Sequence, residues 1–230
     1  MLRHTALFIH RDTTVDGEKL AMLRGLAYLR MECAGVHAAD YGDDILGGSG
    51  RLLEIPPWKR TPRWRARLEG PPSSYDVALH LDFEDERGMA AYDADEAHRG
   101  VARFNASVSV DELTARVDWL YDGPPLIERG RVRHTAMFVW VGDADPDARS
   151  AAFDAVRSFA AASGVESVTV GESIGSHSTD FDWILDVQFA DTASAQALVG
   201  GAVYADVMRV VAPATKYEWT ARVTHVMRGL

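Results

Sequence analysis

The sequence predicts an α+β fold in which two tandem copies of one unit place their antiparallel sheets face to face. Three observations predict it. The phrase LRHTALF at residues 2–8 returns as VRHTAMF at residues 132–138. Three further pairs of segments match in the same order along the chain. Inside each copy the spacing of the apolar residues alternates along the chain between that of a strand and that of a helix.

The further pairs mark the extent of each copy. They are GVHAADYGDDILG (35–47) with GVESVTVGESIGS (164–176), YDVALHLDFED (75–85) with FDWILDVQFAD (181–191), and ELTARVDW (112–119) with EWTARVTH (218–225). The last two pairs lie about two dozen residues closer together than the first two, so the first copy carries an insertion at 48–74. We expect a first repeat at 1–120, a linker with a Pro pair and flanking glycines at 121–130, and a second repeat at 131–230.

The periodicities assign the elements in order. Segment 2–8 alternates as a strand, whose two sides are His4, Ala6 and Phe8 against Thr5 and Leu7. Segment 16–35 is predicted to be a helix that ends at Gly35, with an apolar stripe formed by Leu20, Leu23, Ala27 and Met31. Segment 75–85 alternates again, with Val77, Leu79, Leu81 and Phe83 opposite Asp76, His80 and Asp82. The second copy repeats this order, with its helix at 145–164.

The order β-α-β-β-α-β is that of a ferredoxin-like unit, an antiparallel four-stranded sheet with helices on one face. The other face of each sheet has to be covered. In a tandem pair the two sheets cover each other, as the subunits of a dimeric α/β-barrel do, and we expect a cavity between them. The two copies would then form an internal pseudo-dimer, which leaves further oligomerisation open.

Composition limits the partners. The 230 residues carry 34 acidic and 24 basic side chains, a net charge of −10, which argues against nucleic acid as a partner. No apolar run is long enough to span a membrane, and the N-terminus reads as a first strand and not as a signal peptide. The single cysteine, Cys33, cannot form an internal disulfide. We therefore expect a cytoplasmic protein, and the Ala- and Arg-rich composition suggests a bacterial source.

Several of these features together resemble the stress-responsive dimeric α/β-barrel (Dabb) family. They are the basic residue and His4 before an apolar strand, the Gly-initiated second strand, the aromatic-led YDVALHLDFED strand, Tyr92 six residues before His98, and the strand RVDW at 116–119. The resemblance covers both copies apart from the insertion and the linker. It implies a ferredoxin-like fold. The family includes stress-associated proteins and a plant polyketide cyclase that closes its ring by aldol condensation without a cofactor.

In the cyclase branch the resemblance implies that Tyr92 and His98 act as acid and base in a cavity, with His4 nearby. This chain departs from the pattern at Glu96, where the family usually has a Pro, so the helix could continue unbroken. A spacing of six residues puts two side chains on different faces of a straight helix, and they converge only if the helix ends between them. The alternative is a Tyr that caps the core and an exposed His. In the second copy the aligned residues are Leu198 and Tyr204, so only the first copy keeps the pair.

Other polar residues have competing interpretations. His4 and His134 occupy equivalent positions, which favours a structural role for both. His80 and Asp82 lie two apart on a strand and so share a face, where they could bind substrate, share a proton or bind a metal; the last is the least favoured. No motif has the spacing of a zinc or iron site, and GGSG (47–50) lacks the Lys and helix of a phosphate loop. We expect no metal.

The insertion differs from the rest of the chain because it is basic and rich in Trp. Its residues 51–67 contain Trp58 and Trp64 and six basic side chains, among them Arg63 and Arg65, against Glu54. One interpretation is a lid that closes over an anionic substrate, with Trp58, Arg63 and Arg65 as ligands. A second is a docking loop for an acidic carrier protein, and a third is a loop packed on its own acidic surface.

Two hypotheses about function follow. The first is a cofactor-independent enzyme that uses acid/base chemistry on a small, oxygenated, polyketide-like substrate, as a cyclase, isomerase or lyase of the dehydratase type, in a cavity of the first repeat. The second is a non-catalytic ligand-binding or stress-responsive protein. Loss of the reactive pair in one copy is compatible with both.

Overall fold

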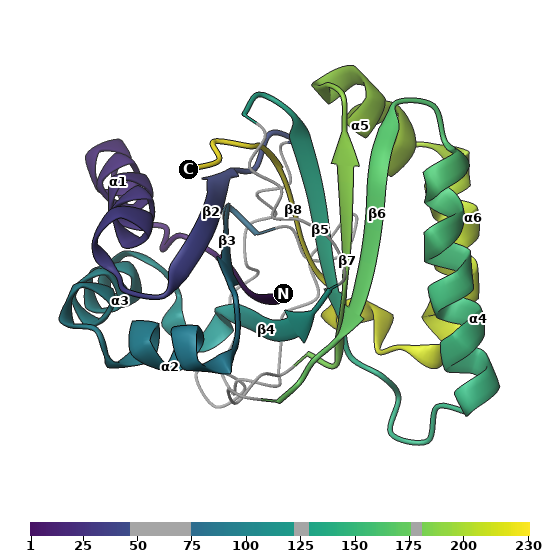
Figure 1. Ribbon diagram of the computed structural model, residues 1–230. Coiled ribbons are helices and arrows are strands. Elements are labelled where there is room, and N and C mark those ends of the chain that lie inside the picture. Colours follow the sequence, from purple (N-terminus) through teal and green to yellow (C-terminus); the bar gives the residue numbers. More distant parts are fainter. Residues whose placement is uncertain (47–74, 122–128, 176–180) are drawn as a thin grey trace.

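The computed structural model describes residues 1–46, 75–121, 129–175 and 181–230 (Figure 1). The first half contains β1 (Leu2–Phe8), α1 (Asp16–Glu32), β2 (Val36–Asp43), β3 (Val77–Phe83), α2 (Glu86–Ala94), α3 (Glu96–Val108) and β4 (Ala115–Leu120). The second contains β5 (Val132–Phe138), α4 (Pro146–Arg157), β6 (Val165–Glu172), β7 (Trp183–Phe189), α5 (Thr192–Val199), α6 (Ala202–Val211) and β8 (Ala221–Val226). Each half thus has the predicted β-α-β-β-α-β order, with the second helix split in two.

The two sheets have the same antiparallel topology. The strand orders are β2-β3-β1-β4 and β6-β7-β5-β8. Their registers also agree, because Thr5 lies opposite His80 in the first sheet and Thr135 lies opposite Asp186 in the second. Figure 1 shows the sheets facing each other, with α1, α2 and α3 outside one and α4, α5 and α6 outside the other. The fold class predicted from the repeats, tandem ferredoxin-like units with facing sheets, is confirmed.

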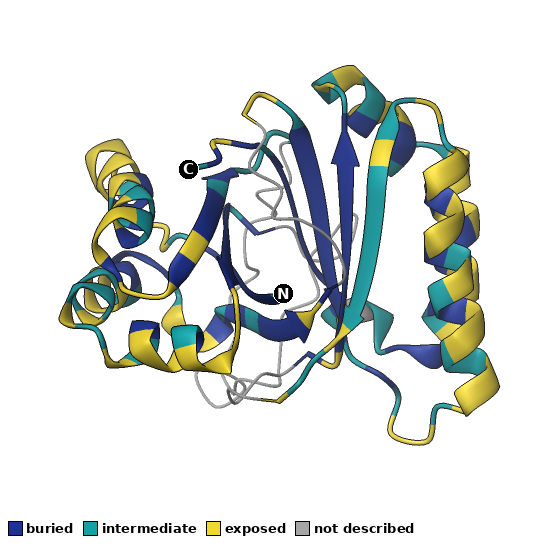
Figure 2. Ribbon diagram, in the orientation of Figure 1, coloured by how far each residue is buried: buried dark blue, intermediate teal, exposed yellow. Residues whose placement is uncertain are grey.

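The strand faces follow the predicted alternation. Ala6 and Phe8 of β1 pack with the helices of the first half, whereas Leu7 and Ile9 belong to a cluster between the sheets. That cluster also contains Trp119 and Met137, so it takes residues from both halves. In Figure 2 the strands are mostly buried, and exposed residues lie along the outer sides of the helices.

Backbone hydrogen bonds join the edges of the two sheets. Ile45 N–H donates to Thr224 O at 2.7 Å, next to the β2 and β8 edges, and Ile174 N–H donates to Asp118 O at 2.8 Å, next to β4 and β6. These contacts satisfy edge groups that an open sheet would leave unpaired. They also bring the backbones close at Gly171, where an added Cβ would stand 2.4 Å from the ring of Trp119.

The apolar stripe predicted for the first helix is partly wrong. Leu20 is 48% and Met31 is 67% exposed. The residues that α1 buries are Met22, Leu23, Leu26 and Leu29. Both stripes are apolar at helical spacing, so the sequence pattern alone could not choose between them.

Among the described residues no single helix has the length and apolar character needed to cross a membrane. One bent pair, Thr192–Val199 with Ala202–Ala214, passes such a test by length and composition only. Its residues Leu198, Tyr204, Val207 and Val211 are buried in the core of the second half.

Candidate functional site

A cavity of about 60 Å³ lies between the first sheet and its own helices. Its apolar wall includes Ala6, Phe8 and Leu29, and its polar lining consists of His4, Tyr92, His98, Asn105, Asp111 and Arg116. The sequence predicted a cavity between the two sheets, whereas this one lies on the opposite face of the first sheet. His4, Tyr92 and His98, which the sequence singled out, all line it.

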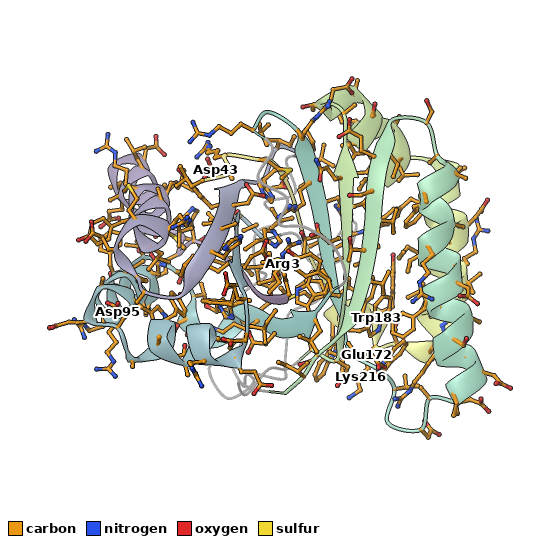
Figure 3. All side chains as sticks on the ribbon, in the orientation of Figure 1. Arg3, Asp43, Asp95, Glu172, Trp183 and Lys216 are labelled. Carbon is orange, nitrogen blue, oxygen red and sulfur yellow. The ribbon has the colours of Figure 1, made fainter. Side chains whose placement is uncertain are left out.

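The pair Tyr92 and His98 meets because the helix is interrupted. Helix α2 ends at Ala94, and Asp95 has extended backbone angles, φ −71° and ψ 136°. The Asp95 carboxylate accepts a hydrogen bond from Ala97 N–H at 2.8 Å, which caps the start of α3. The rings of Tyr92 and His98 stack with centroids 3.9 Å apart. As the N-cap of α3, Asp95 therefore breaks the helix although this chain has no Pro there. Figure 3 labels Asp95 at the outer helix layer.

A buried carboxylate orients the histidine of the first strand. His4 Nδ1 lies 2.6 Å from Asp118 Oδ1, and Asp118 is fully buried on the neighbouring strand β4. Since an ionised carboxylate only accepts hydrogen bonds, Nδ1 carries the proton, and the lone pair of a neutral ring is then on Nε2. The ring of His4 lies 6.3 Å from that of Tyr92. Asp118 belongs to the strand RVDW, but the sequence pattern gives it no role, because only the pairing of β1 with β4 places it beside His4.

Burial sets the protonation of the stacked pair. It raises the pKa of the Tyr92 phenol far above its usual value, so this hydroxyl stays protonated and able to donate a hydrogen bond. Burial also lowers the pKa of His98, which keeps its imidazole neutral at pH 7. The backbone of Asp93 and Tyr92 opposes this lowering, and the His98 Nδ1 atom is buried. The His98 ring lines the cavity, and a neutral imidazole there can take a proton from a ligand.

Two further polar groups line the cavity that the sequence did not single out. Asn105 is only 5% exposed, and its Oδ1 has no hydrogen-bond partner among the described residues. Arg116 lies in β4, two residues before Asp118, and its guanidinium is 3.8 Å from the Asp111 carboxylate, a long separation for an ion pair. Both groups can bind oxygen atoms or hydroxyls of a ligand.

The equivalent region of the second half is filled by side chains. His134 Nδ1 lies 2.8 Å from the Thr224 hydroxyl, and its Nε2 lies 3.1 Å from the Tyr204 hydroxyl. Tyr204 stacks on Phe159 and, with Leu198, belongs to the apolar core. Burial, the nearby Arg222 and His225 lower the pKa of His134 to about 3. The second half therefore has the histidine but neither the carboxylate nor the reactive pair.

His80 and Asp82 do not line this cavity. They lie on the opposite face of the first sheet, between the two sheets, where the ion pairs of Arg3 with Asp82 and Asp186 join the halves. Figure 3 shows Arg3 in this central position. The pairing of β1 with β3 places His4 opposite Leu81, so His80 and Asp82, which flank Leu81, point to the other face of the sheet. Their expected role as substrate ligands thus has no support in the geometry of this cavity.

The same interior holds a group with the geometry of metal ligands. Asp40, His80 and His225 offer atoms within 4.8 Å of one another. Arg133 lies 3.1 Å from Asp40 and already supplies it with a positive charge. Burial and the same Arg133 hold the pKa of His80 well below its usual value. Ion pairing accounts for this group, and a cation would meet the charge of Arg133.

Trp58, Arg63 and Arg65 lie outside the described residues. The lid, docking-loop and packed-loop interpretations of the insertion therefore stay predictions.

Comparisons with known proteins support the fold. No family model and no curated protein matches the chain. Among solved structures, an anthrone oxidase-like protein matches with a TM-score of 0.67 and 11% identity over 100% of this chain and 92% of that one. A protein from Fusobacterium nucleatum named as a putative monooxygenase has a TM-score of 0.58 and 10% identity over 98% and 91%. One from Lactobacillus acidophilus with the same description has a TM-score of 0.53 and 12% identity over 98% and 92%. At these identities the likeness concerns the fold.

Proposed function

We propose that the first half is the active half of a cofactor-independent enzyme, which moves protons on a small oxygenated substrate in the cavity beside His4. The observation that carries this proposal is the His4–Asp118 pair facing the same cavity as the stacked Tyr92 and His98. The second half has Thr224 in place of the carboxylate and Leu198 and Tyr204 in place of the reactive pair. It serves as the structural partner that covers the first sheet.

Each group has a role that suits its environment. His98, neutral at pH 7, takes a proton from carbon next to a carbonyl group. Tyr92, which keeps its own proton, donates a hydrogen bond to the oxygen on which negative charge develops. His4, held by Asp118, exchanges the proton of a substrate oxygen through Nε2. Two proton carriers and one donor suffice for an aldol closure, an isomerisation or a dehydration.

The resemblance to the Dabb family and its cyclase agrees with this class of reaction, and we propose membership of that family for the chain. We also propose that the insertion, through Trp58, Arg63 and Arg65, closes over an anionic part of the substrate. A carrier protein with an acidic surface would approach at the same segment.

A second candidate is an oxidation that starts from the same enolate or phenolate. The observation in its favour is that the three similar structures are described as anthrone oxidase-like or as putative monooxygenases. Proton removal is the first step in both candidates, and they differ in whether the resulting anion reacts with oxygen. Consumption of dissolved oxygen during turnover separates them.

Deuterium exchange tests the proposal without a known substrate. The activated methylene of pentane-2,4-dione exchanges in D₂O, and proton NMR follows the loss of its signal. We expect the protein to accelerate exchange, and His98→Ala, Tyr92→Phe and Asp118→Asn each to reduce the rate by roughly 10² to 10⁴, the usual scale of acid/base groups. His134→Gln in the other half serves as the matched control and keeps the parental rate.

The opposite result is also informative. If the parent exchanges no faster than free imidazole at the same concentration, or if all three variants match the parent, acid/base catalysis is excluded for this cavity. The non-catalytic ligand-binding hypothesis then leads.

A further inference from the structure

The two halves contain equivalent positions, one filled by a side chain of the protein and the other beside a cavity. The first strands correspond residue by residue, so His4 corresponds to His134 and Arg116, opposite Ala6, corresponds to Arg222, opposite Ala136. In the second half the Tyr204 hydroxyl lies 3.1 Å from His134 Nε2 and 3.4 Å from Arg222 Nη1. A phenolic oxygen of the protein itself thus occupies the point between a histidine and an arginine.

The first half has the same two groups but no tyrosine to fill the point. His98 stands at the position of Tyr204 and stacks on Tyr92 instead. Leu29, the residue of α1 that matches Phe159 in the burial pattern, replaces the ring on which Tyr204 stacks. Tyr92 replaces the smaller Leu198, so the first half has one large ring fewer than the second at this place, and the cavity of about 60 Å³ lies there.

We propose that this cavity binds an acidic enol or phenol oxygen of the ligand between His4 Nε2 and the Arg116 guanidinium, where the second half places the Tyr204 hydroxyl. The inference rests on the proposed function and names the chemical class of its substrate. An acidic hydroxyl fits these groups because an unprotonated Nε2 can accept its proton and the guanidinium stabilises the resulting anion. An aliphatic alcohol would gain less, since it stays protonated.

Charge and size agree with this assignment. The Arg116 side chain is 40% exposed, with Asp111 at 3.8 Å, whereas Arg222 is only 8% exposed and reaches Tyr204. Arg116 can therefore turn toward an anion without leaving a tight ion pair. A cavity of about 60 Å³ is smaller than the roughly 150 Å³ that hold a benzene molecule, so the ligand inserts its oxygen-bearing end and extends toward the mouth.

Binding of 4-fluorophenol, followed by fluorine NMR on the full chain, tests the inference. We expect one site in the parent. Arg116→Gln should weaken binding about ten- to a hundredfold, as expected for loss of a charged hydrogen bond, and Arg116→Lys should recover part of it. Fluorobenzene, which has the ring without the oxygen, should bind more weakly than 4-fluorophenol to the parent and equally to parent and Arg116→Gln.

Two more variants use the symmetry directly. His98→Tyr should reproduce the filled second half, abolish 4-fluorophenol binding and leave the melting temperature no lower than that of the parent. Tyr204→Ala should open a second site, and 4-fluorophenol should raise its melting temperature. The inference is wrong if the parent binds no 4-fluorophenol while Tyr204→Ala does, or if Arg116→Gln binds as tightly as the parent. Neither result depends on turnover, so a parent that exchanges deuterium normally would keep the proposed function and lose only this oxygen site.

Discussion

The buried histidine of the second half should make stability depend on pH. His134 has a pKa of about 3 in the folded chain against an ordinary value of 6.5. Between these values the unfolded chain binds a proton that the folded chain does not, so the free energy of unfolding falls as the pH falls from 6.5 toward 3. The slope approaches about 1.4 kcal/mol per pH unit, and the loss between pH 6.5 and pH 5 amounts to about 1.6 kcal/mol.

Chemical denaturation at several pH values measures this loss in the parent and in His134→Gln. The amide of Gln does not titrate, so the difference in unfolding free energy between the two proteins should shrink by that amount on acidification. Thr224→Val is the matched control, because it removes the hydroxyl 2.8 Å from His134 Nδ1 and keeps the titrating ring. It should lower stability while keeping the pH dependence of the parent. Equal pH slopes in the parent and His134→Gln would refute this account of the buried ring.

Two other predictions concern packing and the insertion. Gly171→Ala should destabilise the fold by about 1 to 3 kcal/mol, because its Cβ would meet the fully buried Trp119 ring at 2.4 Å, whereas Gly100→Ala, with open space around it, should be neutral or stabilising by up to about 1 kcal/mol. Thermal unfolding compares them, and equal melting temperatures would contradict the close approach. Neutralising Arg63 and Arg65 together should weaken ligand binding and leave the melting temperature nearly unchanged. A large drop in melting temperature would instead identify the insertion as a structural clamp.

The fold could be predicted from the sequence because the signals were local and occurred twice. The phrase at 2–8 and its copy at 132–138 fixed the repeat, and the period of two assigned Ala6 and Leu7 to opposite faces, as the structure confirms. The prediction of the apolar helix stripe was partly wrong because it, too, used only local sequence. Met31 and Leu29 are both apolar at helical spacing, and only packing against the sheet selects Leu29.

The site could be predicted only in part because its geometry depends on strand register. The resemblance to the Dabb family pointed to Tyr92 and His98, and their convergence depends on the cap that Asp95 provides. The sequence gives Asp118 no role, and it does not tell that His80 faces the space between the sheets while His4 faces the helices. Both placements depend on which residue of a neighbouring strand lies beside His4. The alternation of residue types shows that two residues share a face of one strand. It does not show which residues of a neighbouring strand lie beside them.

Covalent fusion of the two halves separates tasks that a symmetric pair of identical chains has to combine. In such a pair every substitution appears at both sites, so an opened cavity weakens the assembly twice. Here Tyr204 and Phe159 keep one core filled, while His98 and Leu29 leave room in the other. The second half can accumulate stabilising changes with no loss at the reactive groups, and the first can tolerate a costly arrangement of buried polar side chains. Under the proposed function this arrangement gives one ligand site per chain, and substitutions that change ligand preference are expected to concentrate in the first half alone.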